Sequence, residues 1–212
     1  MIWEAIQRAK LGKPNLDTVW LDLANAYGFA PHQMIQQTLR MYHILEDIQI
    51  MLEDSFNGLK MMFLTESYAT DWIILEAGIA MGCTISPILF VLAMKVILRV
   101  AEGIASPADL GSGCCTPPLK AFMDYTTILC SKENVTRSML VRLDALMNWS
   151  RMSFKPKKSR SLSIRKGKLD EDICFNVASQ DIPRINQKLV NSLGRWYDSS
   201  LKYNKRGSEA LE

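Results

Sequence analysis

Apolar residues recur with two different periods along the chain, and the period predicts which segments are helices. Spacings of three or four residues place apolar side chains on one face of a helix. On this basis we expect helices at 2–11, 32–42, 44–56 and 135–149. Segment 87–102 is apolar nearly all round, which predicts a buried helix. Ser86 and Pro87 suit its start, because serine caps helix N-termini and proline is tolerated in the first turn.

Runs of β-branched and aromatic residues between turn residues predict the strands. Segment 17–23 has Val19 and Leu21 on one face and Trp20 and Asp22 on the other. We expect hairpins at 59–65 with 72–76 and within 119–130, a last strand within 190–196, and loops at 25–31, 78–85 and 106–118. Strands that do not alternate regularly with helices indicate the α+β class, with an antiparallel sheet packed on helices.

Composition narrows the class of protein and its compartment. Of 212 residues 48% are hydrophobic, enough for a sizeable core, and the net charge of +3 says little about partners. Five cysteines without a C-x-x-C pair and two histidines argue against structural zinc or a disulfide framework. We therefore expect a reducing intracellular compartment, cytoplasm or nucleus. The uncharged run 77–94 contains Gly78 and Gly82 and fits a turn and a core helix better than a membrane span, so no membrane partner is expected.

Two local patterns suggest chemistry. Asp124 lies within the otherwise apolar and aromatic run 121–130, where an ionised carboxylate is costly unless a cation pairs with it. A metal ion is one interpretation and a plain hairpin turn is the other. Segment 151–168 carries many basic residues and no acidic one, which is typical either of a phosphate-binding surface or of a solvated loop.

Five stretches, in chain order, resemble the palm of a reverse transcriptase of the non-LTR (LINE-type) retroelements. They are WLDLANAYG at 20–28, GIAMGCTISPILF at 78–90, FMDY at 122–125, FKPKKS at 154–159 and SLGRW at 192–196. Each stretch alone is a weak signal, but together they cover the chain from about Asp17 to Trp196. The last of them is similar to the strand called the primer grip.

The resemblance implies RNA-templated DNA synthesis by two-metal nucleotidyl transfer, with Mg²⁺ as cofactor and Mn²⁺ as a substitute. Its implied metal ligands are the carboxylates of Asp22 and Asp124, expected within about 6 Å of each other on adjacent strands, and the carbonyl of Leu23. Lys158 is implied as a proton donor or charge stabiliser at the leaving pyrophosphate, the alternative being one more solvated cation. The implied partners are an RNA template, a DNA primer and deoxynucleoside triphosphates.

The same resemblance implies the substrate contacts. Tyr27 corresponds to a steric gate under the incoming sugar, the alternative being a core tyrosine. Gly82, Ser86 and Pro87 belong to the second motif and are expected beside the nucleotide. For nucleic-acid binding the expected residues are Lys155, Lys157, Arg160 and Gly194.

Three departures from the family pattern reduce the activity that we expect. Tyr125 stands where the family has a second aspartate, and Met81 where it usually has glutamine. The region before Asp17 is too short for the family's fingers, which predicts a truncated copy. Its expected parts are a helix remnant at 1–16, a palm core at 17–150, and a basic segment with primer grip and thumb-proximal tail at 151–212.

We therefore expect an inactive or weak enzyme. The alternatives are a non-catalytic nucleic-acid-binding protein, a decayed retroelement fragment, or an unrelated α+β interaction protein in which the motifs are accidental.

Overall fold

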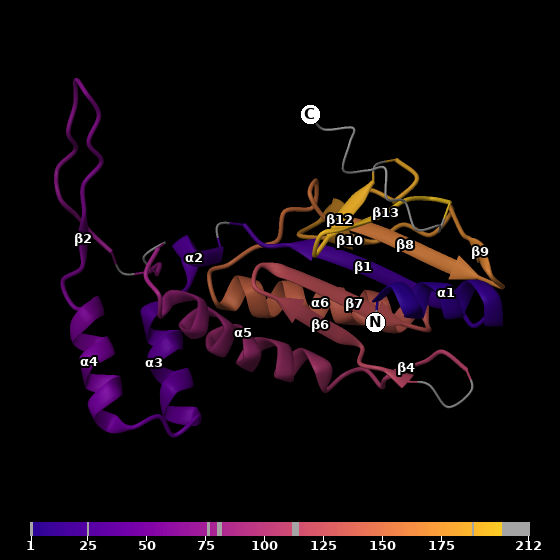
Figure 1. Cartoon of the computed structure of the whole chain (residues 1–212), viewed down its shortest axis with the longest axis horizontal. Coiled ribbons are helices and arrows are strands. Elements are labelled where there is room, and N and C mark those ends of the chain that lie inside the picture. Colours follow the sequence, from indigo (N-terminus) through magenta and orange to yellow (C-terminus); the bar gives the residue numbers. More distant parts are fainter. Residues whose placement is uncertain are drawn as a thin grey trace. The chain divides into compact units, whose positions relative to one another are not determined.

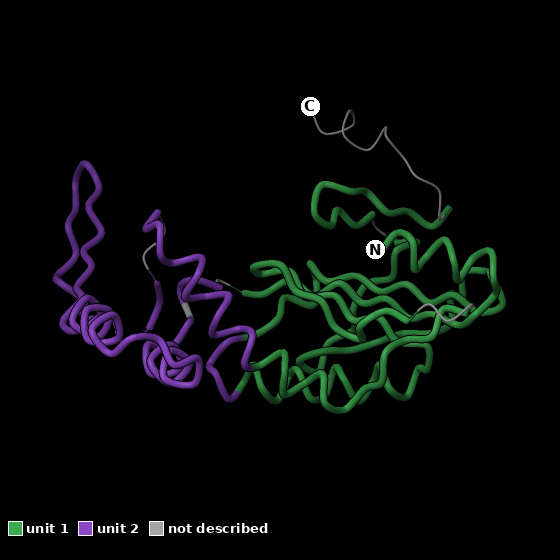
Figure 2. Tube along the Cα trace, turned by 60° about the horizontal axis from the view of Figure 1, so that its bottom comes forward, with its two compact units in different colours: residues 1–24, 97–148, 153–212 green, residues 25–96, 149–152 purple. Residues whose placement is uncertain are grey.

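Strand β1, Leu16–Asp22, lies in the middle of a five-stranded sheet in the computed structural model of the chain (Figure 1). The structure describes residues 2–24, 26–75, 77–79, 82–111, 115–187 and 189–200, except for the side chain of Phe29. It forms two compact units (Figure 2). Unit 1 comprises residues 1–24, 97–148 and 153–212, and unit 2 comprises residues 25–96 and 149–152.

The sheet belongs to unit 1, and every neighbouring pair of its strands is antiparallel. Its order is β6 (Leu119–Phe122), β7 (Tyr125–Cys130), β1, β8 (Arg160–Arg165) and β9 (Lys168–Leu169). β1 is buried from Leu16 to Leu21, because strands flank both of its edges and other elements cover both of its faces.

One face of the sheet packs against helix α1 (Ile2–Gly12) and the hairpin of β12 (Val190–Ser192) and β13 (Arg195–Tyr197). Apolar side chains of all three elements meet there in one buried cluster. The cluster includes Ile6, Leu16, Trp20, Leu162, Ile164, Val190 and Tyr197. The opposite face packs against helix α6 (Glu133–Trp149), which buries Met139, Leu140, Leu143 and Met147.

A buried ion pair holds the start of β1. The Asp17 carboxylate is fully buried, and Nη2 of Arg165 lies 2.7 Å from its Oδ1 and 3.0 Å from its Oδ2. The Thr136 hydroxyl of α6 donates a hydrogen bond to Oδ2 at 3.3 Å. Burial raises the pKa of Asp17, while Arg165 and Thr136 oppose that shift. This one side chain therefore joins β1 to β8 and to α6.

Unit 1 also contains two short hairpins outside the main sheet. They are β4 (Ala108–Asp109) with β5 (Cys115–Thr116), and β10 (Asn176–Val177) with β11 (Gln180–Asp181). The first lies in a segment predicted to be a loop, and that prediction was wrong for its paired residues. A two-residue pairing leaves too short an alternation to be read from the sequence.

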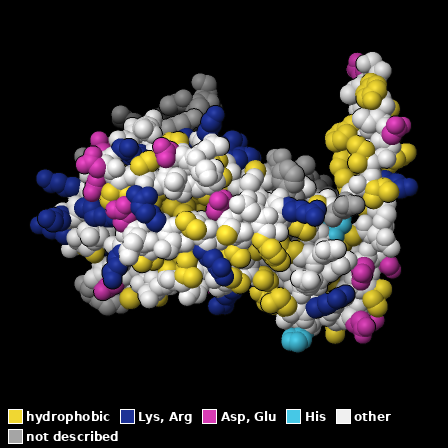
Figure 3. Space-filling view, turned by 180° about the vertical axis from the view of Figure 1, so that it is seen from behind, with side chains coloured by type: hydrophobic (Ala, Val, Ile, Leu, Met, Phe, Trp, Pro, Cys, Tyr) yellow, Lys and Arg dark blue, Asp and Glu magenta, His cyan; other side chains and the backbone are white. Residues whose placement is uncertain are grey.

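Unit 2 consists of three helices, a hairpin and the start of a fourth helix. These are α2 (Ala26–Phe29), α3 (His32–Met41), α4 (Glu46–Phe56), β2 (Lys60–Met61) with β3 (Ile73–Ile74), and α5 (Ser86–Glu102). The hairpin extends beyond the end of α4 and exposes a row of large apolar side chains (Figures 1 and 3). Among them are Phe63, Leu64, Trp72 and Ile74.

The predicted helices are confirmed to within a few residues, and the α+β class is confirmed. Three details differ from expectation. The predicted loop at 25–31 contains α2, and the last predicted strand is a hairpin with its turn at Leu193 and Gly194. Helix α5 is not buried all round, because Ile88 and Val91 are exposed on one side while Phe90 and Ala93 are buried on the other. Within the described residues, no helix combines the length and the apolar character that crossing a membrane requires.

The buried ion pair generates the first prediction. Arg165→Met leaves the Asp17 carboxylate without its cation, and the free energy of unfolding should fall by about 3 kcal/mol in urea denaturation. The loss should grow as pH rises above the pKa that Asp17 has in the unmodified fold, because without Arg165 the folded variant holds the Asp17 proton more tightly than the unmodified protein does. Glu133→Gln, which breaks an exposed pair with Arg137, is the control and should cost about 0.5 kcal/mol or less. Equal effects of both changes would contradict the structural role of the buried pair.

Candidate active site

Asp22 ends β1 directly opposite Tyr125, the first residue of β7. Opposed residues of an antiparallel pair project on the same face, so Asp22 and Tyr125 are cross-strand neighbours. Asp124 immediately precedes Tyr125 in the tight turn after β6, and its carbonyl accepts a hydrogen bond of 3.2 Å from the Leu23 amide. In the same turn Met123 has a left-handed φ of +53°. The register thus brings together three residues of the motifs: Asp22 at the end of β1, Asp124 in the turn and Tyr125 at the start of β7.

The Asp22 carboxylate is shielded from solvent on one side and faces cationic side chains on the other. Its side chain is 17% exposed, and Nζ of Lys155 lies 3.9 Å from Oδ1. Burial raises the pKa of Asp22, the charges of Lys155 and Lys158 lower it, and the charge of Asp124 raises it. The two aspartates are therefore close enough to repel each other, and the charges of the two lysines outweigh that repulsion.

The segment that carries these lysines is fixed to the end of β1 by its backbone. The Lys155 amide donates a hydrogen bond of 2.7 Å to the Asp22 carbonyl. The Asp22 amide donates one of 3.3 Å to Oγ of Ser159, which in turn donates to the Lys155 carbonyl at 2.9 Å. Phe154 makes an antiparallel bridge with Leu23. This ring of bonds explains why Lys155 and Lys158 lie within electrostatic reach of Asp22.

The side chains at this end of the sheet provide few metal ligands. Among the described residues, no group of three or more His, Cys, Asp or Glu side chains could hold a metal ion. Burial, followed by the charges of Asp124 and Asp22, raises the pKa of Tyr125, so its phenol is neutral at pH 7. Two carboxylates fit Mg²⁺ that also carries phosphate ligands, since such sites use one or two carboxylates with substrate phosphates.

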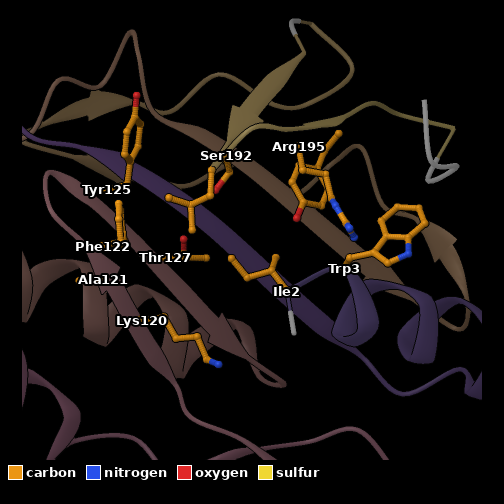
Figure 4. A pocket seen from close by; sticks show the side chains of 11 residues that line it. Ile2, Trp3, Lys120, Ala121, Phe122, Tyr125, Thr127, Ser192 and Arg195 are labelled. Atoms are coloured by element: carbon orange, nitrogen blue, oxygen red, sulfur yellow. The ribbon is translucent and has the colours of Figure 1, made fainter. Parts of the chain in front are cut away.

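A groove of about 410 Å³ lies on the same face of the sheet as Tyr125 (Figure 4). Tyr125 and Thr127 of β7 and Lys120 of β6 line it from the sheet, and Ser192 and Arg195 of the β12–β13 hairpin line it from above. A second hollow of about 30 Å³ lies beside Asp22. Its lining includes Trp20, Tyr125, Lys158 and Ser192. The hairpin thus stands over the acidic end of β1.

Contacts with the aromatic residue Trp3 of α1 hold the β12–β13 hairpin in place over the sheet. The Trp3 and Tyr197 rings lie 6.2 Å apart, and the Arg195 guanidinium lies 5.8 Å from the centre of the Trp3 ring. The hairpin turn itself is free of such contacts. Leu193 and Gly194 both have positive φ, +52° and +74°, as in a type I′ turn, and a Cβ on Gly194 would meet nothing within 4 Å.

The cations of the basic segment 151–168 differ in their exposure, because the fold buries part of the segment and leaves the rest at the surface. Part of it forms β8 and β9, so the alternative of a solvated loop does not describe it. The Arg160 side chain is buried and donates to the carbonyls of Lys157 and Ser159. A guanidinium in this position is not available to an external phosphate. The exposed cations of the segment are Arg151, Lys157, Lys158, Lys166 and Lys168.

The remaining expected substrate contacts lie in unit 2. The half-buried Tyr27 stacks on Phe90 of α5, with ring centres 5.2 Å apart and an interplanar angle of 29°. Ser86 is buried and begins α5, followed by Pro87. Gly82 has φ +92° in the preceding loop. Met81 lies outside the described residues.

Comparison with known proteins identifies the family. The family model described as "Reverse transcriptase (RNA-dependent DNA polymerase)" matches residues 7–197. The chain belongs to the reverse transcriptase family. Among solved structures it is similar to apo telomerase from Candida tropicalis truncated from its C-terminal domain, with a TM-score of 0.58 and 10% sequence identity. The similarity covers 96% of this chain and 38% of that one. No match was found among curated proteins.

In this reverse transcriptase domain, several residues that shape the site were not singled out from the sequence. Ser159 joins Asp22 to the lysine segment, and Trp3 supports the β12–β13 hairpin. Gly78 has φ +97°, and a Cβ there would lie 2.9 Å from the carbonyl oxygen of Gly28. Its amide also donates to the Ala30 carbonyl. Each of these contacts joins segments distant in sequence, so local patterns did not reveal them.

The two glycines of the second motif generate the second prediction. Gly78→Ala and Gly82→Ala both place alanine at a φ near +95°, which costs about 1–2 kcal/mol at each. Only Gly78→Ala also meets a backbone oxygen, and we expect it to cost about 1–3 kcal/mol more than the other. Denaturant unfolding of both variants, monitored by a probe in unit 2, measures the difference. Equal losses would show that Gly28 and Gly78 do not approach closely in solution.

Proposed function

We propose that this chain is a retroelement-derived reverse transcriptase domain whose inherited reaction is RNA-templated DNA synthesis, impaired by Tyr125. The observation that carries the proposal is the pairing of Asp22 with the start of β7, next to Asp124 and within reach of Lys155 and Lys158. Two carboxylates beside lysines suit a reaction that binds triphosphate and releases pyrophosphate. Because the five stretches resemble those of non-LTR elements, we extend the proposal to an origin in such an element.

In this proposal each residue has a distinct role. Mg²⁺ held by Asp22, Asp124 and the Leu23 carbonyl would stabilise the attacking and leaving oxygens of nucleotidyl transfer. Lys158 neutralises charge on the pyrophosphate or donates a proton to it. Tyr27 excludes the 2′ hydroxyl of a ribonucleotide, and Gly82, Ser86 and Pro87 border the nucleotide. The Gly194 turn contacts the primer.

Tyr125 is the feature of this site that opposes catalysis. Its neutral phenol brings no charge, and it projects beside Asp22, where a carboxylate would share the metal. The site therefore retains ligands for a nucleotide-bound Mg²⁺ and lacks one for an ion at the primer hydroxyl. The second candidate function, a reverse transcriptase-like domain that binds nucleic acid without catalysis, rests on this same residue.

The third prediction tests catalysis by reversing the substitution. Tyr125→Asp should raise the rate of primer extension by roughly 10²–10³, corresponding to ~3–4 kcal/mol of transition-state stabilisation. Asp22→Asn in the Tyr125→Asp background is the matched control and should remove the gain.

Equal rates for the tyrosine and aspartate forms would mean that Tyr125 does not impair the enzyme. A gain that survives Asp22→Asn would remove Asp22 from the proposed metal site.

The fourth prediction concerns two exposed lysines, Lys157 and Lys158, of the segment that is hydrogen-bonded to the end of β1. Primer–template duplex should bind without sequence preference, and its affinity should fall steeply with salt. Lys157→Ala combined with Lys158→Ala should reduce the slope of log affinity against log salt by about 1–2, since each phosphate contact contributes about 0.9. Lys95→Ala with Lys60→Ala, which removes the same charge elsewhere, is the control. An unchanged slope in the first variant would place the phosphate contacts outside this segment.

A further inference from the structure

Unit 2 contains a groove of about 540 Å³ that plays no part in the site described above. Gln33, Met34 and Gln37 of α3 line one side, and Trp149 and Arg151 line the other. Trp149 is the last residue of α6 and residues 150–152 follow it, yet all four belong to unit 2, as Figure 2 shows by their colour. The fold thus places an aromatic residue and a cation opposite a polar helix face.

The lining has the chemistry of a nucleotide-binding surface. Trp149 is 68% exposed, so a large planar ring meets water unless something stacks on it. Gln33 and Gln37 are exposed one helical turn apart, and each amide both donates and accepts hydrogen bonds, as base edges require. Met34 lies between them in sequence. Its side chain is buried and supplies an apolar part of the groove lining.

The charge of the groove favours an anion. Arg151 is exposed and held in the left-handed region at φ +57°, and none of the described residues that line the groove is acidic. Arg40, exposed three residues after Gln37, extends the same face of α3 with a second cation. An aromatic platform beside a cation is the arrangement with which proteins hold unpaired nucleotides.

We propose that this groove binds single-stranded nucleic acid, with one base stacked on Trp149 and its phosphate against Arg151. A folded protein partner would need a broader apolar surface than Met34 and one tryptophan ring provide. The proposal does not depend on catalysis, because every residue in it lies outside the Asp22 site. A domain that had lost nucleotidyl transfer would still bind an unpaired strand here.

The test compares three labelled ligands on the full chain by fluorescence anisotropy. They are a single-stranded oligouridine of about 12 nucleotides, a blunt duplex of the same length, and uridine monophosphate. Trp149→Ala should weaken binding of the single strand about 5-fold or more, and Trp149→Tyr should restore most of it. Arg151→Gln should lower the salt slope for the single strand by about 0.7. Both variants should bind the duplex as the unmodified chain does.

The matched control is Trp72→Ala, which removes another exposed tryptophan of unit 2 outside the groove and should leave single-strand affinity unchanged. Photo-crosslinking with 5-iodouridine in the oligonucleotide should label Trp149. Unchanged single-strand affinity in Trp149→Ala would overturn the proposal and favour a protein partner for the groove. Equal losses of single-strand and duplex affinity would also overturn it. Tight binding of the monophosphate alone would overturn it in favour of a free nucleotide.

These outcomes are separable from those of the catalytic proposal. If the Asp22 site is inactive, Trp149→Ala still lowers single-strand affinity. If this groove is empty in solution, the effect of Lys157→Ala with Lys158→Ala on duplex binding is unaffected.

Discussion

The register of β1 between β7 and β8 is the constraint on which the rest of the structure depends. Because side chains alternate across a strand, a slip of one residue would move every side chain of β1 to the opposite face. Asp17 would leave Arg165 and Thr136, and Asp22 would leave the face that it shares with Tyr125. Trp20 would leave the buried cluster in which α1 and the β12–β13 hairpin pack against the sheet. Stability and site geometry are therefore set by the same pairing.

Two aspartates of β1 show how position decides what a carboxylate does. Asp17 lies inside the sheet, where a guanidinium and a hydroxyl occupy its oxygens and nothing else can reach it. Asp22 lies five residues on, at the end of the strand, where its nearest cation is a lysine at 3.9 Å and part of its surface is open. Burial raises the pKa of both. Only Asp22 can exchange its cation for another, so only Asp22 can take part in chemistry.

The sequence was most informative where the pattern was local. Alternation in 17–23 predicted which residues of β1 share a face, and the motifs predicted neighbouring strands for Asp22 and Asp124; β1 pairs with β7, which Asp124 directly precedes. The helix starts followed from spacing and from Ser86-Pro87. These features depend on neighbours within a few residues, which is the range over which periodicity carries information.

What the sequence did not predict depends on contacts across the chain. Arg160 was expected to bind nucleic acid, but it occupies a β8 position opposite Trp20 and is buried. Arg165, of the same basic segment, is the partner of Asp17. The opposite error concerns α5, which was expected to be buried all round. Its Ile88 and Val91 are exposed, because none of the described residues packs on that side of the helix. Charge and hydropathy alone do not state which face a neighbour will cover.

The two ends of β1 also differ in how easily they tolerate substitution. Arg165 cannot change without leaving a buried charge, so the fold itself resists its loss. Tyr125 is 39% exposed at the edge of a turn, where a substitution costs the fold little. In the proposed metal site, a change there would remove a ligand while the sheet, the lysine segment and the hairpin keep their places. The constraints that preserve the fold thus act on different residues from those that the proposed catalysis needs, so under this proposal a chain would retain the fold after its chemistry had weakened.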